Sequence, residues 1–110
     1  MSEQQQALTA LYHASDGPSW LNKLNWLDNN VSYCEWHGVF CSENNDVQAL
    51  DLGSNGLRGA LSSELSALTK LHRLWLYNNE ISGTLASELS PLTKLWILRL
   101  ANNAISGTLA

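Results

Sequence analysis

The sequence contains little charge, and neither sign is clustered. Charged residues make up 15% of the 110 positions, with six Lys and Arg against ten Asp and Glu, for a formal net charge of -4. Nucleic acids and anionic membrane surfaces select for basic clusters, so both are poor candidate partners. The apolar fraction of 45% excludes a disordered chain, and the length suits a single domain with a sizeable core.

Long apolar runs and catalytic motifs are also missing. No stretch approaches the roughly 20 apolar residues of a membrane-spanning helix, and residues 1–6 lack the basic and apolar regions of a secretion signal. His13, Ser15 and Asp16 lie close together, but no nucleophile-elbow sequence accompanies them. Phosphate-binding glycine loops and metal-binding carboxylate motifs are absent as well. We therefore expect no enzyme activity, no cofactor, no bound metal and no direct membrane insertion by this segment.

Leucine is abundant by contrast, supplying 21 residues, and it recurs with a fixed period. Aligning the chain with itself at an offset of 24 residues matches leucine, asparagine and glycine together. Chance alignment of a leucine-rich chain would not also align the other two. The period indicates turns that each contain one strand and one return segment. The matched copies are Leu50-x-Leu52-x-x-Asn55-x-Leu57-x-Gly59-x-Leu61, Leu74-x-Leu76-x-x-Asn79-x-Ile81-x-Gly83-x-Leu85 and Leu98-x-Leu100-x-x-Asn103-x-Ile105-x-Gly107-x-Leu109.

Each repeated position has a physical interpretation. Alternating leucines such as Leu50 and Leu52 share one face of a short strand and point inward. The repeated asparagine is polar where burial is expected, so its amide is predicted to bond the backbone as the chain turns. The glycines suit a positive φ or a close backbone approach. Leucines spaced by three residues between the strands predict 3₁₀ or short helical return segments.

Residues 71–85 resemble the plant-type leucine-rich repeat, with Leu71, Leu74, Leu76, Asn79 and the Ile81-Ser-Gly-Thr-Leu85 ending. The resemblance implies an α/β leucine-rich repeat solenoid with a short parallel sheet, 24-residue repeats and a helical N-terminal cap. The family's usual Gly-x-Ile-Pro ending lacks its proline here, for example in Gly83-Thr84-Leu85-Ala86, which makes the family's extra short strand a weaker expectation.

Residues 1–46 do not repeat, and they resemble the cap that precedes such repeats. Ser2 and Gln5 fit a helix-capping box, and Ala7-Leu8-Thr9-Ala10-Leu11 matches the cap helix. The segment 16–20, Asp-Gly-Pro-Ser-Trp, resembles a variant found in protist and bacterial members. Trp20, Trp26 and Trp36 are predicted to cover the first turn; a sugar-stacking platform is the alternative. We expect a cap over 1–46 and about two and a half repeats over 47–110.

Cys34 and Cys41 occupy the cysteine positions of this cap, and the resemblance implies a disulfide between them. A disulfide implies an oxidising compartment, hence an extracellular or cell-surface location. The alternative is a zinc ion held by Cys34, His37 and Cys41, which lacks an evident fourth ligand. Asn30-Val31-Ser32 forms a glycosylation sequon, a weak signal in a chain with 11 asparagines.

The outward residues of the strands are the candidate ligand-binding site. If the leucines face inward, alternation turns the residues between them onto the concave face of the sheet. Arg73, Trp75, Tyr77 and Arg99 have the composition of a binding hot spot, with Asp51 in the neighbouring row. The alternative is that Trp75 and Tyr77 only cover adjacent strands. The full set is Ala49, Asp51, Gly53, Arg73, Trp75, Tyr77, Ile97, Arg99 and Ala101.

The resemblance to receptor-like and secreted members implies non-catalytic extracellular recognition of a protein, peptide or glycan. Two alternatives remain: a secreted inhibitor of a cell-wall hydrolase, and a structural capping segment of a longer array. The third repeat stops before its return segment, so we expect a partly bare end at Leu98, Leu100, Ile105 and Leu109. Such an end favours end-to-end self-association or continuation into further repeats.

Overall fold

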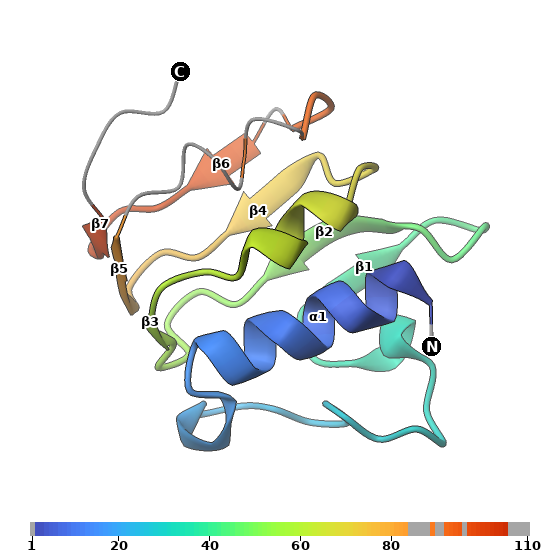
Figure 1. The fold of residues 1–110 in the computed structure, drawn as a ribbon, viewed down its shortest axis with the longest axis horizontal. Coiled ribbons are helices and arrows are strands. Elements are labelled where there is room, and N and C mark those ends of the chain that lie inside the picture. The colour runs from blue at the N-terminus through green and yellow to red at the C-terminus, as the bar shows by residue number, and fades with distance from the viewer. Residues whose placement is uncertain (1, 84–88, 90–91, 96, 106–110) are drawn as a thin grey trace.

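The chain winds into stacked turns, each contributing one strand to a shared sheet (Figure 1). The computed structural model describes residues 2–83, 89, 92–95 and 97–105. The elements in chain order are α1 Glu3–Ala14, the 3₁₀ turns η1 Gly17–Ser19 and η2 Tyr33–Glu35, β1 Val39–Cys41, β2 Val47–Asp51, β3 Arg58–Gly59, the 3₁₀ turn η3 Ser63–Ala67, β4 Arg73–Trp75, β5 Glu80–Gly83, β6 Ile97–Arg99 and β7 Ala104–Ile105.

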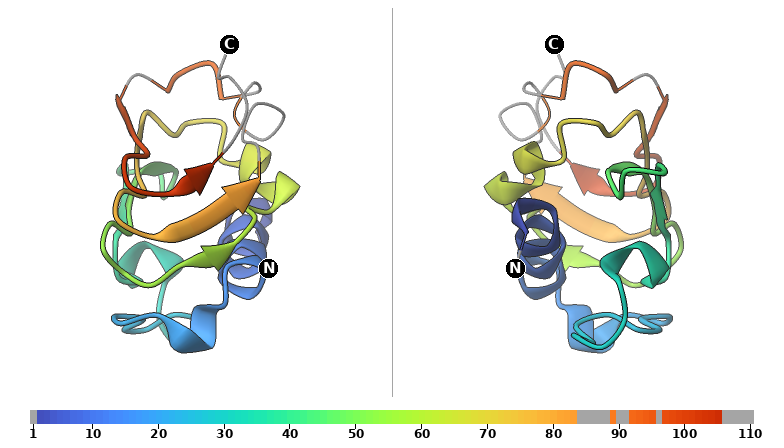
Figure 2. Two further views of the ribbon diagram at one scale, coloured as in Figure 1. Left: turned by 90° about the vertical axis from the view of Figure 1, so that its left-hand side faces the viewer. Right: turned by 90° about the vertical axis from the view of Figure 1, so that its right-hand side faces the viewer.

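Two sheets run through the stack. The first has the order β1-β2-β4-β6, and the second has the order β3-β5-β7. β2, β4 and β6 are parallel and pair in one constant register, with Ala49 opposite Arg73 and Arg73 opposite Ile97. The strands of the second sheet lie one above another on an adjacent side (Figure 2). The parallel stack confirms the predicted leucine-rich repeat solenoid, and the second sheet forms without the usual proline.

The interior is built from the inward leucine rows. Leu50, Leu52, Leu74 and Leu76 are fully buried, as alternation predicts. The three-residue leucine spacing produces η3, whose Leu65 is buried against α1 and the strands. Each fully buried leucine stabilises the fold by roughly 1.5–3 kcal/mol relative to an exposed one. The stacking of turns is therefore driven mainly by this shared apolar interior.

The repeated asparagines bond the backbone inside the turns. Asn79 accepts hydrogen bonds from the Asn55 and Leu57 N–H groups, both at 3.0 Å. Its Nδ2 donates to the carbonyls of Leu52 and Leu76, both at 2.9 Å. Asn103 repeats this one turn later, accepting from Ile81 N–H and donating to Leu76 O. The asparagine row is thus structural, as the sequence predicts.

The segment before the first repeat closes the end of the stack. Ser2 caps α1 by accepting a hydrogen bond from Gln5 N–H, while the Gln5 side chain donates to Asn29 instead of completing the capping box. Tyr12, Trp20, Trp26 and Trp36 are all buried and in successive ring contact. Their burial favours the covering role over the sugar-stacking platform. Within the described part of the chain, no helix combines the length and apolar character needed to cross a bilayer.

Some predicted repeat positions lie outside the described residues. These are Leu85, Gly107 and Leu109. Leu98 and Leu100 are partly buried, and the side chains of Ile105 and Leu109 lie outside the described residues.

The buried asparagine row predicts a large loss of stability on truncation. Asn79→Ala leaves two backbone N–H groups and two backbone carbonyls without the side chain that they bond. Each buried group left unpaired costs about 1–3 kcal/mol. We expect denaturant titration to show a loss of about 3 kcal/mol or more in the free energy of unfolding. The neighbouring Asn78 is exposed with φ 55°, so Asn78→Gly should change stability by less than about 1 kcal/mol. Equal losses in the two variants would contradict the structural role.

Candidate functional site

The outward face of the first sheet, here called the sheet face, gathers the predicted site residues. The register places Asp51, Trp75 and Arg99 in one row across β2, β4 and β6. Arg73 begins the neighbouring row, with Ile97 beside it on β6. Tyr77 follows β4 in the next row. All five predicted residues therefore lie on one continuous surface, as alternation requires.

Trp75 forms the centre of the sheet face. The Arg73 Cζ atom lies 4.8 Å from the centroid of the Trp75 ring, and the Arg99 Cζ atom lies 4.7 Å from it. Both distances suit cation–π interactions, which fix long arginine side chains against a rigid ring. The Trp75 side chain is half-buried rather than freely exposed, because the two arginines cover it.

The arginines of the sheet face have no counter-ion among the described residues. In the part of the chain that the structure describes, neither Arg73 nor Arg99 forms an ion pair, and the salt bridge present joins Arg58 to Glu80 at 3.1 Å. The nearby Asp51 uses its carboxylate to accept from Gly53 N–H at 3.3 Å. Arg73 Nε and Trp75 Nε1 are buried donors without an acceptor. The face therefore carries positive charge, with two unpaired donors buried beneath it.

Tyr77 behaves differently from Trp75, because the far end of its ring lies over Gly53, just after β2. A Cβ atom added to Gly53 would fall 2.4 Å from the Tyr77 ring, so the glycine makes room for the ring. The alternative interpretation, in which an aromatic residue covers a neighbouring strand, thus describes Tyr77. Ala49 is also buried, although alternation predicted an outward position. Its small side chain lies in the row between Phe40 and Arg73, which reach across it.

Sequence reasoning missed Phe40 and understated Ile97. Phe40 lies on β1, which pairs antiparallel with β2, and this strand is not part of the repeat. Its side chain is 51% exposed, and Arg73 Cζ lies 5.5 Å from its ring centroid. Ile97 is 42% exposed at the opposite end of the same row. The alternation Val39-Phe40-Cys41 after a glycine was the available signal for an extra strand. These residues add an apolar margin to the arginines.

The cysteines form the implied disulfide, Cys34–Cys41. It ties η2 to β1, and thus the cap to the edge of the first sheet. The zinc alternative is wrong, because both of its thiolate ligands are consumed in this bond. No cluster of three metal-ligating side chains exists among the described residues. Asn30 is exposed in the loop before η2.

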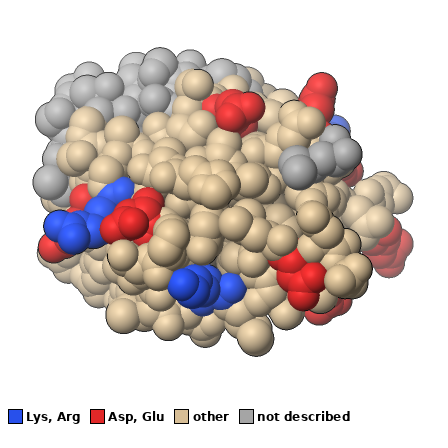
Figure 3. Space-filling model, turned by 60° about the horizontal axis from the view of Figure 1, so that its bottom comes forward, with Lys and Arg blue, Asp and Glu red and all other residues tan. Residues whose placement is uncertain are grey.

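Charge is sparse on the cap end of the molecule. Figure 3 brings this end forward and shows mostly uncharged atoms, with the few blue groups lying apart from one another. No basic patch forms on this side, which agrees with the low count of Lys and Arg. On the sheet face, by contrast, Arg73 and Arg99 both stack on Trp75.

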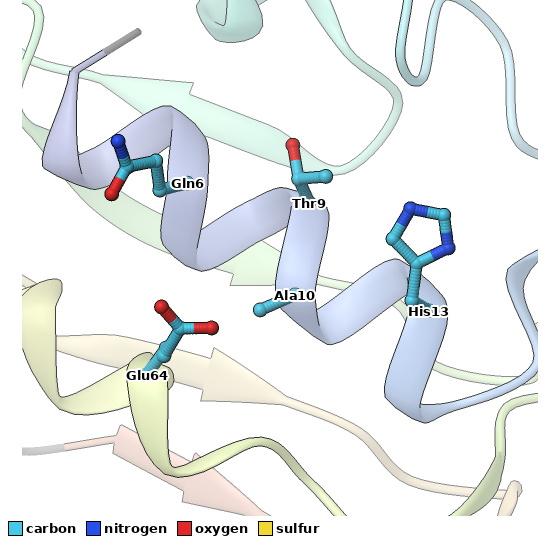
Figure 4. Close-up of a pocket in the computed structure, with 5 residues that line it drawn as sticks. All are labelled: Gln6, Thr9, Ala10, His13 and Glu64. Carbon is cyan, nitrogen blue, oxygen red and sulfur yellow. The ribbon is translucent and has the colours of Figure 1, made fainter.

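A shallow groove lies between α1 and η3, beside the His13 of the sequence cluster His13, Ser15 and Asp16 (Figure 4). It has a volume of about 320 Å³ and is lined by Gln6, Thr9, Ala10, His13 and Glu64. His13 points outward from α1, whereas Ser15 is buried and its hydroxyl donates to Leu11 O. A nucleophile held in this way cannot be activated by His13. The groove therefore lacks the geometry of a catalytic site.

Comparison with known protein families and curated proteins finds leucine-rich repeat families and a plant receptor-like kinase. Residues 1–42 match the leucine rich repeat N-terminal domain family, and residues 70–92 match the leucine rich repeat family. The chain is 46% identical over 54 residues to receptor-like protein kinase 5 of Arabidopsis thaliana, covering 48% of this chain and 5% of that protein. The chain thus spans a small fraction of the length of this curated relative.

Solved structures give the same grouping. The Arabidopsis receptor kinase HAESA, in complex with the peptide hormone IDA and the co-receptor SERK1, matches with a TM-score of 0.83 and 33% identity, over 96% of this chain and 18% of that chain. The BIR2 ectodomain from Arabidopsis thaliana matches with a TM-score of 0.82 and 28% identity, over 94% of this chain and 56% of that chain.

The contact between Gly53 and Tyr77 predicts a specific coupling. Gly53→Ala should destabilise the protein by about 1–3 kcal/mol, because the new methyl group displaces the Tyr77 ring. In a Tyr77→Ala background the same change should cost clearly less, because the ring is gone. Denaturant titration of the four proteins measures this coupling. Additive losses would show that the ring does not occupy the space above Gly53.

The disulfide predicts a chemical and a thermodynamic result. Non-reducing peptide mapping of the native protein should find Cys34 linked to Cys41. Replacing both by Ser should lower the free energy of unfolding by roughly 2–3 kcal/mol, because the short loop is no longer closed in the unfolded chain. Ready alkylation of both thiols without denaturant would contradict the bond and the extracellular location it supports.

Proposed function

We infer that this chain, which is a leucine-rich repeat protein of the plant type, is a non-catalytic recognition module that binds an acidic protein or peptide through its sheet face. The interaction takes place outside the cell. Asp51, Arg73, Trp75, Tyr77 and Arg99 form the binding surface, with Phe40 and Ile97 at its apolar margin. The carboxylates of the partner bind the guanidinium groups of Arg73 and Arg99.

One observation carries this proposal. Two arginines without a carboxylate partner in the described residues lie 4.8 and 4.7 Å from the centroid of one indole ring. Positively charged groups held on a rigid surface lose little side-chain entropy when an anion binds. The buried donors Arg73 Nε and Trp75 Nε1 gain an acceptor if these side chains rearrange around a carboxylate.

The relatives support recognition rather than catalysis. HAESA was solved with the peptide hormone IDA and the co-receptor SERK1, so that relative binds a peptide and a protein. The present chain corresponds to 18% of the HAESA chain. A protein or peptide ligand is preferred over a glycan because the guanidinium groups compete with a sugar ring for the Trp75 indole. The disulfide supports an oxidising, extracellular location.

The two parts of the chain have different proposed roles in the stack. We assign residues 1–46 as a helical cap and 47–110 as about two and a half repeats of 24 residues. The capping interpretation is supported by the buried Trp20, Trp26 and Trp36 at one end. The small share of its relatives that the chain covers favours a second candidate, in which this segment caps a longer array and the main binding site lies in further repeats.

A peptide array tests the sheet face directly. The array holds peptides rich in Asp and Glu, the same peptides with Asn and Gln, and oligogalacturonates. The wild-type chain should bind the acidic peptides in preference to their amide counterparts. Trp75→Ala and Arg99→Ala should each weaken binding at least about 5- to 30-fold, the effect of losing about 1–2 kcal/mol at an interface hot spot.

Arg58→Ala is the matched control for Arg99→Ala. It removes the same charge, but from β3 on the second sheet, where Arg58 pairs with Glu80. This variant should bind like the wild type, and circular dichroism should show that all variants are folded. Equal losses of peptide affinity in Arg58→Ala and Arg99→Ala would mean that binding depends on the net charge of the protein and not on the sheet face. Binding to oligogalacturonate alone would contradict the peptide proposal.

A further inference from the structure

We propose that Asn30 carries an N-linked glycan, a proposal that rests on the extracellular location inferred above. The chain contains a single Asn-x-Ser/Thr triplet, Asn30-Val31-Ser32. Sequence alone gave this triplet little weight, because a chain with 11 asparagines is expected to contain about one by chance. The structure adds two independent observations, namely the surface position of the triplet and the free state of its amide.

Asn30 lies at the exposed tip of a turn. Val31 N–H donates to Asp28 O at 3.2 Å, and Asn30 N–H donates to the Asp28 side chain at 2.9 Å. Asp28, Asn29 and Asn30 are all exposed. Acceptor asparagines of this kind occur on surface loops of secreted proteins, where a bulky glycan meets no packed neighbour.

The Asn30 amide is free, whereas those of other asparagines in the same loop are engaged. Asn22 Oδ1 accepts from Leu24 N–H, Asn25 Nδ2 donates to Glu35 O, and Asn29 Oδ1 accepts from the Gln5 side chain. The Asn30 side chain makes no hydrogen bond with the described residues. The asparagine of the sequon is thus the one whose substitution breaks no side-chain contact in this part of the chain.

The position is compatible with the proposed binding surface. The loop between residues 20 and 32 runs along the end of the stack opposite β6 (Figure 1), on the cap end that Figure 3 brings forward. The sheet face is formed by β1, β2, β4 and β6. A glycan at Asn30 therefore shields the weakly charged cap end and leaves the arginines of the sheet face accessible.

The reaction is a glycosyl transfer. The Asn30 amide nitrogen forms a bond to the anomeric carbon of an oligosaccharide, whose bond to a lipid pyrophosphate breaks. The lipid pyrophosphate leaves with the bonding electron pair, and the amide nitrogen loses one proton to a base of the transferase. Ser32 belongs to the acceptor triplet; in the folded chain its hydroxyl oxygen accepts from Cys34 N–H at 3.2 Å, at the start of η2.

Expression behind a cleavable secretion signal in a eukaryotic host tests the proposal. Chains from the medium and from the lumenal fraction are analysed by intact and peptide mass spectrometry, with and without a peptide N-glycosidase. We expect an added glycan mass that the enzyme removes, leaving Asp at position 30. Asn30→Gln and Ser32→Ala should each abolish the added mass. Asn29→Gln, a change at the neighbouring exposed asparagine, should retain it.

The outcomes separate this proposal from the proposed function. Disulfide-bonded chain recovered from the medium or the lumen without a glycan overturns the proposal, as does a glycan that persists in Asn30→Gln. Binding of acidic peptides by unglycosylated protein leaves the sheet-face function intact. A glycosylated chain that ignores acidic peptides overturns the function and leaves the modification site standing.

Discussion

The buried asparagine row is the constraint on which the rest of the structure depends. A chain that leaves each strand by turning inward exposes backbone N–H and C=O groups to an apolar interior, where unpaired groups are costly. Asn79 and Asn103 satisfy groups of their own turn and of the turn before. At the first turn no earlier repeat exists, and Asn55 instead exchanges two hydrogen bonds with the backbone of Asn22 in the cap. The cap thus completes the same bonding pattern that joins the repeats.

This bonding fixes the register, and the register determines the chemistry of the sheet face. Because each turn repeats the last, a residue on one strand always lies beside its equivalent on the next, and its side chain must fit that neighbour. The fit of Tyr77 against Gly53 and the small Ala49 between Phe40 and Arg73 satisfy this requirement. Trp75 is different, because its neighbours in the row are Asp51 and Arg99. Of these two neighbours, Arg99 stacks on the ring, and Arg73 from the adjacent row stacks on it as well.

Sequence predicts most of this fold because the repeat encodes it. The inward leucines, the asparagine row, the return turn η3 and the rows of the sheet face all follow from a period and an alternation. The sequence does not predict the contacts that fall outside the 24-residue repeat. β1 pairs antiparallel and brings Phe40 to the sheet face, the first asparagine bonds Asn22, and Tyr77 covers its neighbour while Trp75 holds two arginines. These depend on side-chain reach across strands, which no single strand pattern records.

The arginines on the sheet face are difficult to explain as structural groups. Arg58 on the second sheet has a counter-ion, because it pairs with Glu80 across β3 and β5 on an exposed surface. Arg73 and Arg99 lie instead over Trp75 without an ion pair to the described residues, in a chain whose net charge is -4. Stacking restrains both side chains against the ring, and a carboxylate would supply the counter-charge that the described residues do not. A surface that is stable alone but improved by a bound carboxylate is the arrangement expected of a recognition site.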